Sequence, residues 1–269
     1  MAEDLRDVFG WSLPFEADVL GPTLMKLTER AGIIASSFDG LRSRMRVSTV
    51  HGRLFLHSAY PTVAEDSVFL GPDTYRFADF IAQEIAGRPR LDRIVDIGSG
   101  AGVGGVLAGL ARPQASVVLT DINPLALRLA KINATHAGLD ATISCGNGLD
   151  GIDGEIDLAL ANPPYIVDDQ ARTYRDGGGM HGAELSLKWA LAAAPRLSRG
   201  GAMLLYTGSA IVNGRDALCE ALQQALPELG CSVRYREIDP DIFGEELGKP
   251  AYADVERIAA VGAVIVRDA

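Results

Sequence analysis

The stretch "VDIGSGAGVGG", residues 95–105, decides the fold of this chain. It begins as an apolar strand, passes into a glycine-rich turn, and is followed by a predicted helix that runs to about Leu110. Glycine lets a backbone turn sharply and approach a ligand closely. The N-terminus of the following helix offers free N–H groups. The order of strand, glycine turn and helix therefore predicts a ligand-binding loop in an α/β fold.

Strands and helices alternate outward from this loop. The predicted strands are RIVDIG (93–98), SVVLTDI (116–122), ATISC (141–145), IDLALAN (156–162) and AMLLYTG (202–208), and further helices are predicted over 124–136, 185–197 and 215–226. This alternation predicts a parallel sheet with helices on both faces. Two more strands, at 232–238 and 256–267, are separated by a loop with no convincing helix, so we expect the last strand to return antiparallel. Open α/β sheets bind ligands beyond the carboxyl ends of their parallel strands.

A smaller segment precedes this domain. It contains a predicted helix over 23–30 and a β-hairpin over 44–61, whose turn is His51-Gly52. We therefore divide the chain into an N-terminal helical and hairpin cap, 1–58, and a ligand-binding domain, 59–269. Arginines at positions 42, 44 and 46 alternate along the expected first hairpin strand. They would share one face, either as an anion or RNA patch or as a solvated strand edge.

The composition excludes several classes of protein. The chain has 269 residues, 48% of them hydrophobic and 22% charged, which is typical of a globular protein. No run approaches about 20 apolar residues, and the acidic N-terminus does not resemble a secretory signal, so we expect no membrane span. Three scattered cysteines fit a reducing cytoplasm, and neither they nor the four histidines have metal-ligand spacing. The net charge of −10 disfavours nonspecific binding to a phosphate backbone.

The glycine loop by itself is compatible with two kinds of ligand. Gly100 to Gly105 satisfies the dinucleotide pattern G-x-G-x-x-G, and Asp121 follows Gly100 by 21 residues, as a ribose-binding acid would. An NAD-dependent oxidoreductase is therefore one alternative. However, Asp96 stands two residues before Gly98, where a carboxylate would repel a pyrophosphate and would suit an ammonium group.

The spacing Asp-x-Gly-x-Gly-x-Gly from Asp96 to Gly102 resembles the glycine motif of class I S-adenosylmethionine-dependent methyltransferases. The resemblance implies a Rossmann-like fold, with a seven-stranded, mostly parallel sheet whose last strand is antiparallel. It implies that the loop wraps the methionine part of the cofactor and that Asp121 binds the ribose hydroxyls. Asn147 occupies the place of the residue that accepts a hydrogen bond from adenine, although Asn-Gly also suits a simple turn.

A second motif lies in "LALANPPYIVDD", residues 158–169. Asn-Pro alone would predict a turn. Proline forces the preceding residue toward extended geometry and has no N–H, so the acceptors left to face the cleft are the Asn162 side-chain oxygen and backbone carbonyls. Two such acceptors suit a planar NH2 group, because they bind its protons and orient its lone pair toward a methyl donor. Tyr165 adds a flat ring that would stack on the carrier of this nitrogen.

With the upstream loop, this stretch is similar to the Asn-Pro-Pro-Tyr type of methyltransferase small domain, which modifies amide or exocyclic nitrogens. Members include protein-glutamine N5-methyltransferases (HemK/PrmC-like) acting on peptide-chain release factors, DNA adenine methyltransferases and rRNA guanine-N2 enzymes. The resemblance implies a cytoplasmic N-methyltransferase whose first-choice acceptor is a glutamine amide in a protein. An rRNA or other nucleobase nitrogen comes second and a small molecule third, and the sequence leaves the oligomeric state open.

The glutamine-type enzymes carry a Pro-containing, acid-then-hydroxyl segment beside the cofactor, and Glu65-Asp66-Ser67 would match it, with Tyr60 and Phe69 as apolar walls. A helix over 74–85, capped by Asp73 or Thr74, is predicted next. The resemblance thus implies catalytic roles for Asn162, Pro163, Pro164 and Tyr165. It implies cofactor contacts for Tyr60, Glu65, Asp66, Ser67, Asp96, Gly98, Ser99, Gly100, Gly102, Asp121, Ile122, Asn123, Asn147, Gly148, Leu149 and Asn162, and no metal.

Two later segments are candidates for the acceptor side. The loop 239–256 joins the last two strands, and we expect Phe243, Glu245 and Tyr252 to line the substrate pocket. Gly177–Gly179 is either the hinge of a substrate lid or an ordinary flexible loop. His181 and Glu184 could face the substrate.

Overall fold

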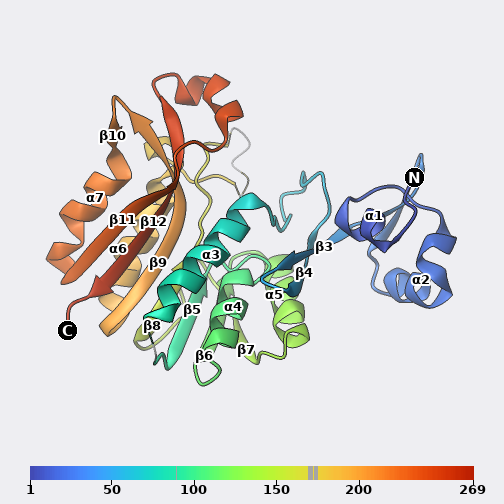
Figure 1. Cartoon of the computed structure of the whole chain (residues 1–269), viewed down its shortest axis with the longest axis horizontal. Helices are drawn as coiled ribbons and strands as arrows, with labels where there is room; N and C mark the ends of the chain where they lie inside the picture. Colours follow the sequence, from blue (N-terminus) through green and yellow to red (C-terminus); the bar gives the residue numbers. More distant parts are fainter. Residues whose placement is uncertain (89, 169–171, 173–174) are drawn as a thin grey trace.

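The computed structural model of the chain describes residues 1–88, 90–168, 172 and 175–269. Figure 1 shows a large twisted sheet covered by helices and a small N-terminal unit to one side, which the β3–β4 hairpin joins to the larger part. None of the helices in the described ranges is long and apolar enough to cross a membrane.

The large sheet has the order β11-β12-β9-β8-β5-β6-β7, and a short β10 pairs with β9. Its strands are β5 (Arg93–Ile97), β6 (Ser116–Asp121), β7 (Ala141–Cys145), β8 (Ile156–Ala161), β9 (Leu197–Val212), β10 (Arg215–Asp216), β11 (Cys231–Asp239) and β12 (Arg257–Arg267). The five strands from β7 to β9 run parallel, and β12 lies antiparallel between β9 and β11. The predicted seven-stranded arrangement is confirmed, with β10 as an addition.

Helices cover both faces of the sheet, because the central strands are apolar on both sides. On β8, Leu158 and Leu160 join the core beneath one layer, whereas Ala159 and Ala161 join the core beneath the other. The first layer contains α3 (Pro72–Ala86), α4 (Val103–Ala111) and α5 (Pro124–His136), and the second contains α6 (Glu184–Ala193) and α7 (Ala217–Ala225). Short 3-10 helices are η1 (Ala17–Leu20), η2 (Met180–Gly182), η3 (Ala194–Arg196), η4 (Pro227–Leu229), η5 (Gly244–Gly248) and η6 (Pro250–Tyr252).

The N-terminal unit has a core of its own, made by Ala2, Val8, Phe15 and Leu20. It consists of α1 (Leu5–Gly10), η1, α2 (Gly21–Arg30) and a hairpin of β1 (Ile34–Ser37) with β2 (Gly40–Ser43), which the sequence did not predict. The predicted hairpin is present as β3 (Met45–Val50) and β4 (Arg53–Ser58), with the positive φ angles of a tight turn at positions 51 and 52. Arg42 and Arg46 therefore lie on different hairpins, so the prediction that the arginines alternate along one strand was wrong.

The β3–β4 hairpin docks onto the larger part of the molecule through Asn133 of α5. The Asn133 Oδ1 accepts from the N–H of Leu56 at 2.8 Å, and its Nδ2 donates to the carbonyls of Leu56 at 3.0 Å and Ala101 at 2.8 Å. Val50 and Phe55 of the hairpin are buried in the core beneath the first helix layer. The hairpin thus packs with the larger domain, and the division at residue 58 stays a prediction.

Candidate active site

A cavity of about 490 Å³ opens at the carboxyl ends of the parallel strands. Of the expected site residues, it is lined by Ser67, Asp96, Gly98, Ser99, Gly100, Asp121, Ile122, Asn123, Asn147, Gly148, Asn162, Pro163, Pro164 and Tyr165. Tyr60, Glu65, Asp66, Gly102 and Leu149 lie outside the lining. The loops at the ends of β5, β6, β7 and β8 therefore meet at a single pocket, as the rule for open α/β sheets predicts.

The glycine loop has the backbone conformation that its composition predicts. Gly98, Gly100 and Gly102 have φ angles of 65°, 52° and 80°, which residues other than glycine rarely adopt. Gly102 is the N-cap of α4 and supports the loop from outside the pocket. A Cβ on Gly105 would lie 2.2 Å from the Leu119 side chain, so α4 packs directly against β6.

Asp96 is a buried acid at the end of β5. Only 2% of its surface is exposed, and its Oδ2 accepts from the Gly105 N–H at 2.7 Å. Burial raises the pKa of Asp96 to about 7, the charge of Asp121 raises it further, and the hydrogen bond from Gly105 opposes the shift. A cation placed in this part of the pocket would favour the carboxylate form.

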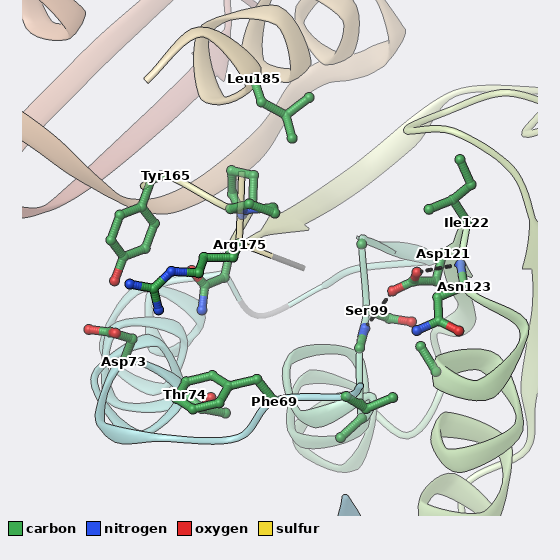
Figure 2. A pocket seen from close by; sticks show the side chains of 18 of the residues that line it. Phe69, Asp73, Thr74, Ser99, Asp121, Ile122, Asn123, Tyr165, Arg175 and Leu185 are labelled. Atoms are coloured by element: carbon green, nitrogen blue, oxygen red, sulfur yellow. Dashed lines mark hydrogen bonds between the residues drawn. The ribbon is translucent and has the colours of Figure 1, made fainter. Parts of the chain in front are cut away.

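Asp121 is held by backbone N–H groups on both of its oxygens. Gly100 donates to Oδ2 at 2.9 Å and Asn123 donates to Oδ1 at 2.8 Å, as Figure 2 shows. Burial raises the pKa of Asp121 in spite of these bonds. Each carboxylate oxygen keeps a second lone pair for a ligand hydroxyl. Beside it the Ile122 side chain is 52% exposed and forms an apolar wall of the pocket.

Of the residues expected from the segment before α3, Ser67 and Phe69 line the cavity. The Asp66 side chain does not line it, and the Asp66 carbonyl instead accepts from Asn123 Nδ2 at 2.8 Å. Sequence reasoning missed Asp73 and Thr74, which line the cavity from the first turn of α3. The signal for them was present, because Pro72-Asp73-Thr74 repeats the pattern of proline, acid and hydroxyl a few residues further on.

Asn147 and Trp189 form another wall. The Asp150 N–H donates to the Asn147 carbonyl at 3.2 Å, so the predicted turn is present, and Asn147 also lines the cavity. Trp189 of α6 was missed, because no motif marks it in the sequence. A Cβ on Gly98 would lie 2.6 Å from its ring, and one on Gly148 would lie 3.2 Å away, so the indole packs on both glycine turns.

The Asn-Pro-Pro-Tyr segment directly follows β8. Its Tyr165 is only 7% exposed: a Cβ on Gly208 would lie 2.3 Å from the ring, and the Phe243 ring meets it edge-on with 5.9 Å between centroids. The ring that we expected to stack on the acceptor is thus largely enclosed. A Cβ on Gly182 would lie 2.3 Å from the Tyr165 carbonyl, so glycine is required there for packing.

The segment Gly177–Gly179, which follows this motif, is hydrogen-bonded to neighbouring residues. Gly177 donates to the Ile166 carbonyl at 2.9 Å, and Gly179 donates to Glu184 at 2.7 Å. His181 pairs with Asp254 at 3.1 Å, and neither His181 nor Glu184 lines the cavity. These bonds connect the described part of the segment to the protein, and the role of a lid hinge stays a prediction.

A network of polar side chains lies at the end of the pocket that contains Tyr165. Asp73 accepts from the Tyr206 hydroxyl at 2.8 Å, and Arg76 lies 3.5 Å from Asp73 and 2.7 Å from Asp239. Figure 2 shows Asp73, Tyr165 and Arg175 at this end. Burial, followed by the Asp73 charge, raises the pKa of Tyr165 well above its usual value. Within the described ranges, the buried Tyr165 hydroxyl has no hydrogen-bond partner.

The loop between β11 and β12 reaches the pocket at one expected position. Phe243 lines the cavity, whereas Glu245 and Tyr252 do not. The Tyr252 hydroxyl instead accepts from the Val167 N–H at 2.8 Å and so supports the segment that follows Tyr165. Among the residues that the structure describes, no three His, Cys, Asp or Glu side chains are grouped as a metal site would require.

The pocket has the chemistry that S-adenosylmethionine would need. Ser99 lines it, and in the described part of the chain its buried Oγ has no hydrogen-bond partner, as expected of an atom that awaits a ligand. Asp96 suits an ammonium group and Asp121 suits ribose hydroxyls. The Rossmann-like sheet, the glycine loop and the Asn-Pro-Pro-Tyr segment together define a class I S-adenosylmethionine-dependent methyltransferase.

Comparison with known proteins agrees with this class. Residues 68–222, more than half of the chain, match the family named Methyltransferase small domain. The chain belongs to this family, and the alternative of an NAD-dependent oxidoreductase is not supported.

The relatives include enzymes with different acceptors. The chain is 32% identical over 170 residues to a release factor glutamine methyltransferase of Deinococcus radiodurans, covering 62% of this chain and 60% of the relative. It is 36% identical over 72 residues to a ribosomal RNA small subunit methyltransferase C of Pseudomonas entomophila, covering 27% and 22%. The chain thus matches at most about three fifths of these two relatives.

Solved structures confirm the Rossmann-like fold. Methanocaldococcus jannaschii Trm5 in complex with adenosine matches with a TM-score of 0.55 and 16% identity, over 84% of this chain and 55% of that one. Trm5b of Pyrococcus abyssi matches with a TM-score of 0.57 and 15% identity, over 87% and 62%. At these identities the likeness concerns the fold alone.

Proposed function

We propose that this protein transfers a methyl group from S-adenosylmethionine to a planar nitrogen, with the side-chain amide of a protein glutamine as the first-choice acceptor. The observation that carries the proposal is the position of Asn162-Pro163-Pro164-Tyr165 at the end of β8. There it faces the same cavity as Asp96 and Asp121, which lie near the carboxyl ends of β5 and β6. Strand β5 is the direct neighbour of β8 in the sheet. The residues expected to hold the cofactor and those expected to hold the acceptor thus line one pocket.

The cofactor would be held by the glycine-loop side of the cavity. Asp96 would neutralise its ammonium group, Asp121 would accept from its ribose hydroxyls, and the Asn147 side-chain oxygen would accept from its adenine amino group. Ile122 offers the apolar surface for the base. When bound, the cofactor supplies an electrophilic methyl group on a positively charged sulfur.

The acceptor nitrogen would be oriented by the Asn-Pro-Pro-Tyr segment. The Asn162 side-chain oxygen and the Pro163 carbonyl would accept its two N–H groups, which leaves the nitrogen lone pair directed toward the cofactor side. Orientation of this kind lowers the barrier of a displacement. The two oxygens also stabilise the positive charge that grows on nitrogen before a proton leaves it.

Two features support a protein acceptor over nucleic acid. The release factor enzyme of Deinococcus radiodurans is matched over 60% of its own length, whereas the ribosomal RNA large subunit methyltransferase G of Streptomyces coelicolor is matched over 41% and the small subunit enzyme of Pseudomonas entomophila over 22%. The net charge of −10 also disfavours a phosphate-rich substrate. An exocyclic nitrogen of rRNA is the second candidate because ribosomal RNA methyltransferases occur among the relatives. A cytoplasmic location is part of the proposal.

Transfer of labelled methyl from S-adenosylmethionine tests the proposal. A purified bacterial peptide-chain release factor, ribosomal RNA and the small-molecule fraction of a cell lysate serve as separate acceptors, with Asn162→Ala as the control enzyme. We expect label in the release factor, recovered as N5-methylglutamine after digestion, and at least a hundredfold less with the Ala variant. Label in RNA alone would replace the glutamine assignment. An absence of label in all three acceptors would contradict methyl transfer.

A further inference from the structure

Phe243 has a backbone conformation that is unusual for its side chain. It lies between β11 and η5 with φ 54° and ψ 39°, in the left-handed region that glycine and asparagine favour. A bulky side chain there is a strained outlier, and such outliers concentrate at functional sites. The Phe243 side chain lines the cavity, so this strained residue lies at the candidate site.

The surrounding contacts keep the strained turn in place. The Ile242 N–H donates to the Ile258 carbonyl at 2.7 Å on one side, and the Glu246 N–H donates to the Phe243 carbonyl at 2.8 Å on the other. The Glu246 side chain is 4% exposed and pairs with both Arg175 and Lys249. Because Arg175 also lines the pocket, the ring is positioned by the same network that builds the pocket wall.

Phe243 offers the aromatic surface that Tyr165 lacks. Tyr165 is enclosed between Gly208 and the Phe243 ring, whose plane is tilted 67° to its own. Phe243 itself is only half-buried and faces the cavity beside the Asn-Pro-Pro-Tyr segment. A planar group held by Asn162 would need an apolar wall of this kind, because aromatic rings pack well against flat groups.

We propose, on the basis of the function proposed above, that Phe243 is a specificity-determining residue that forms the aromatic wall of the acceptor subsite. Its ring packs against the planar amide or base that carries the acceptor nitrogen, and Tyr165 supports that ring from behind. The strained backbone is the means by which the loop directs a large ring into the pocket.

The test separates the side chain from the backbone strain. Phe243→Gly removes the ring and relieves the strain, Phe243→Leu keeps an apolar side chain without the ring, and Phe243→Tyr keeps the ring. Asn213→Gly is the matched control, because Asn213 also has a positive φ of 50° but lies outside the cavity lining. Each variant is assayed for methyl transfer to release factor, or to ribosomal RNA if the wild type labels only RNA, and for S-adenosylhomocysteine binding by calorimetry.

We expect the Gly and Leu variants to raise KM for the acceptor about tenfold and to leave S-adenosylhomocysteine affinity within twofold of the wild type. The Tyr variant and the Asn213 control should retain the wild-type KM. An unchanged KM in the folded Gly and Leu variants would overturn the assignment, and so would an equal loss of S-adenosylhomocysteine binding. A wild-type protein that labels neither acceptor would instead refute the proposed function, and the Phe243 assignment with it.

Discussion

Asp96 shows how burial alone changes the chemistry of a common side chain. A free aspartate is ionised at neutral pH, but burial raises the pKa of Asp96 from 3.8 to about 7. The folded protein therefore binds more protons than the unfolded chain between these two values. It follows that Asp96 makes the ligand-free protein less stable as the pH rises from about 4 to about 7. A cationic ligand reverses this preference, because it stabilises the carboxylate.

We therefore predict that S-adenosylhomocysteine binds more weakly as the pH falls below 7. The affinity for S-adenosylhomocysteine should fall by up to about tenfold for each pH unit below 7 and should be constant above pH 7. Calorimetric titration between pH 5.5 and 8.5 measures this dependence. Asp96→Asn should bind weakly at every pH and lose the slope, whereas an unchanged slope in this variant would assign the titration to another group.

At the scale of elements, close packing fixes the ring of Tyr165 in the Asn-Pro-Pro-Tyr segment. Strand β9 brings Gly208 against the Tyr165 ring, and a Cβ at that position would lie 2.3 Å from the ring. Aromatic carbons cannot approach so closely, so a larger residue must displace either the ring or the strand.

We predict that Gly208→Ala lowers the free energy of unfolding by about 1–3 kcal/mol and reduces methyl transfer by at least tenfold. Gly87→Ala is the matched control, because no atom lies within 4 Å of a Cβ at that position. Urea denaturation and initial rates measure both effects. Wild-type rates in Gly208→Ala would show that the position of Tyr165 does not matter for transfer.

At the scale of the whole molecule, Asn133 connects three parts that are distant in sequence. Its buried side chain joins the β3–β4 hairpin, helix α5 and the loop that carries Ala101. Removal of the amide would leave the N–H and carbonyl of Leu56 and the carbonyl of Ala101 without this partner.

Asn133→Ala should therefore destabilise the protein by about 2–3 kcal/mol, since buried polar groups that lose their partners are costly. Ile132→Ala, on the exposed side of the same helix, should have a much smaller effect. Thermal and urea unfolding compare the two. Equal effects would mean that the hairpin is held by its apolar contacts alone.

The sequence predicted the architecture because its signals are local. Alternating strands and helices, the glycine loop at 98–102 and the Asn-Pro-Pro-Tyr segment lie within short windows, and the rule for strand ends places them at one edge of the sheet. The β1–β2 hairpin was missed because its two strands have four residues each and no strong alternation of polar and apolar residues.

The sequence by itself determined the class of protein, the sheet and the loops that face one another, because each depends on a short pattern and a general rule of topology. Only the tertiary structure decided which side chains complete the pocket. Asp73, Thr74 and Trp189 reach it from helices whose local patterns resemble ordinary core or surface sequence. Their positions depend on contacts between segments far apart in the chain, and such contacts leave no periodicity in a single sequence.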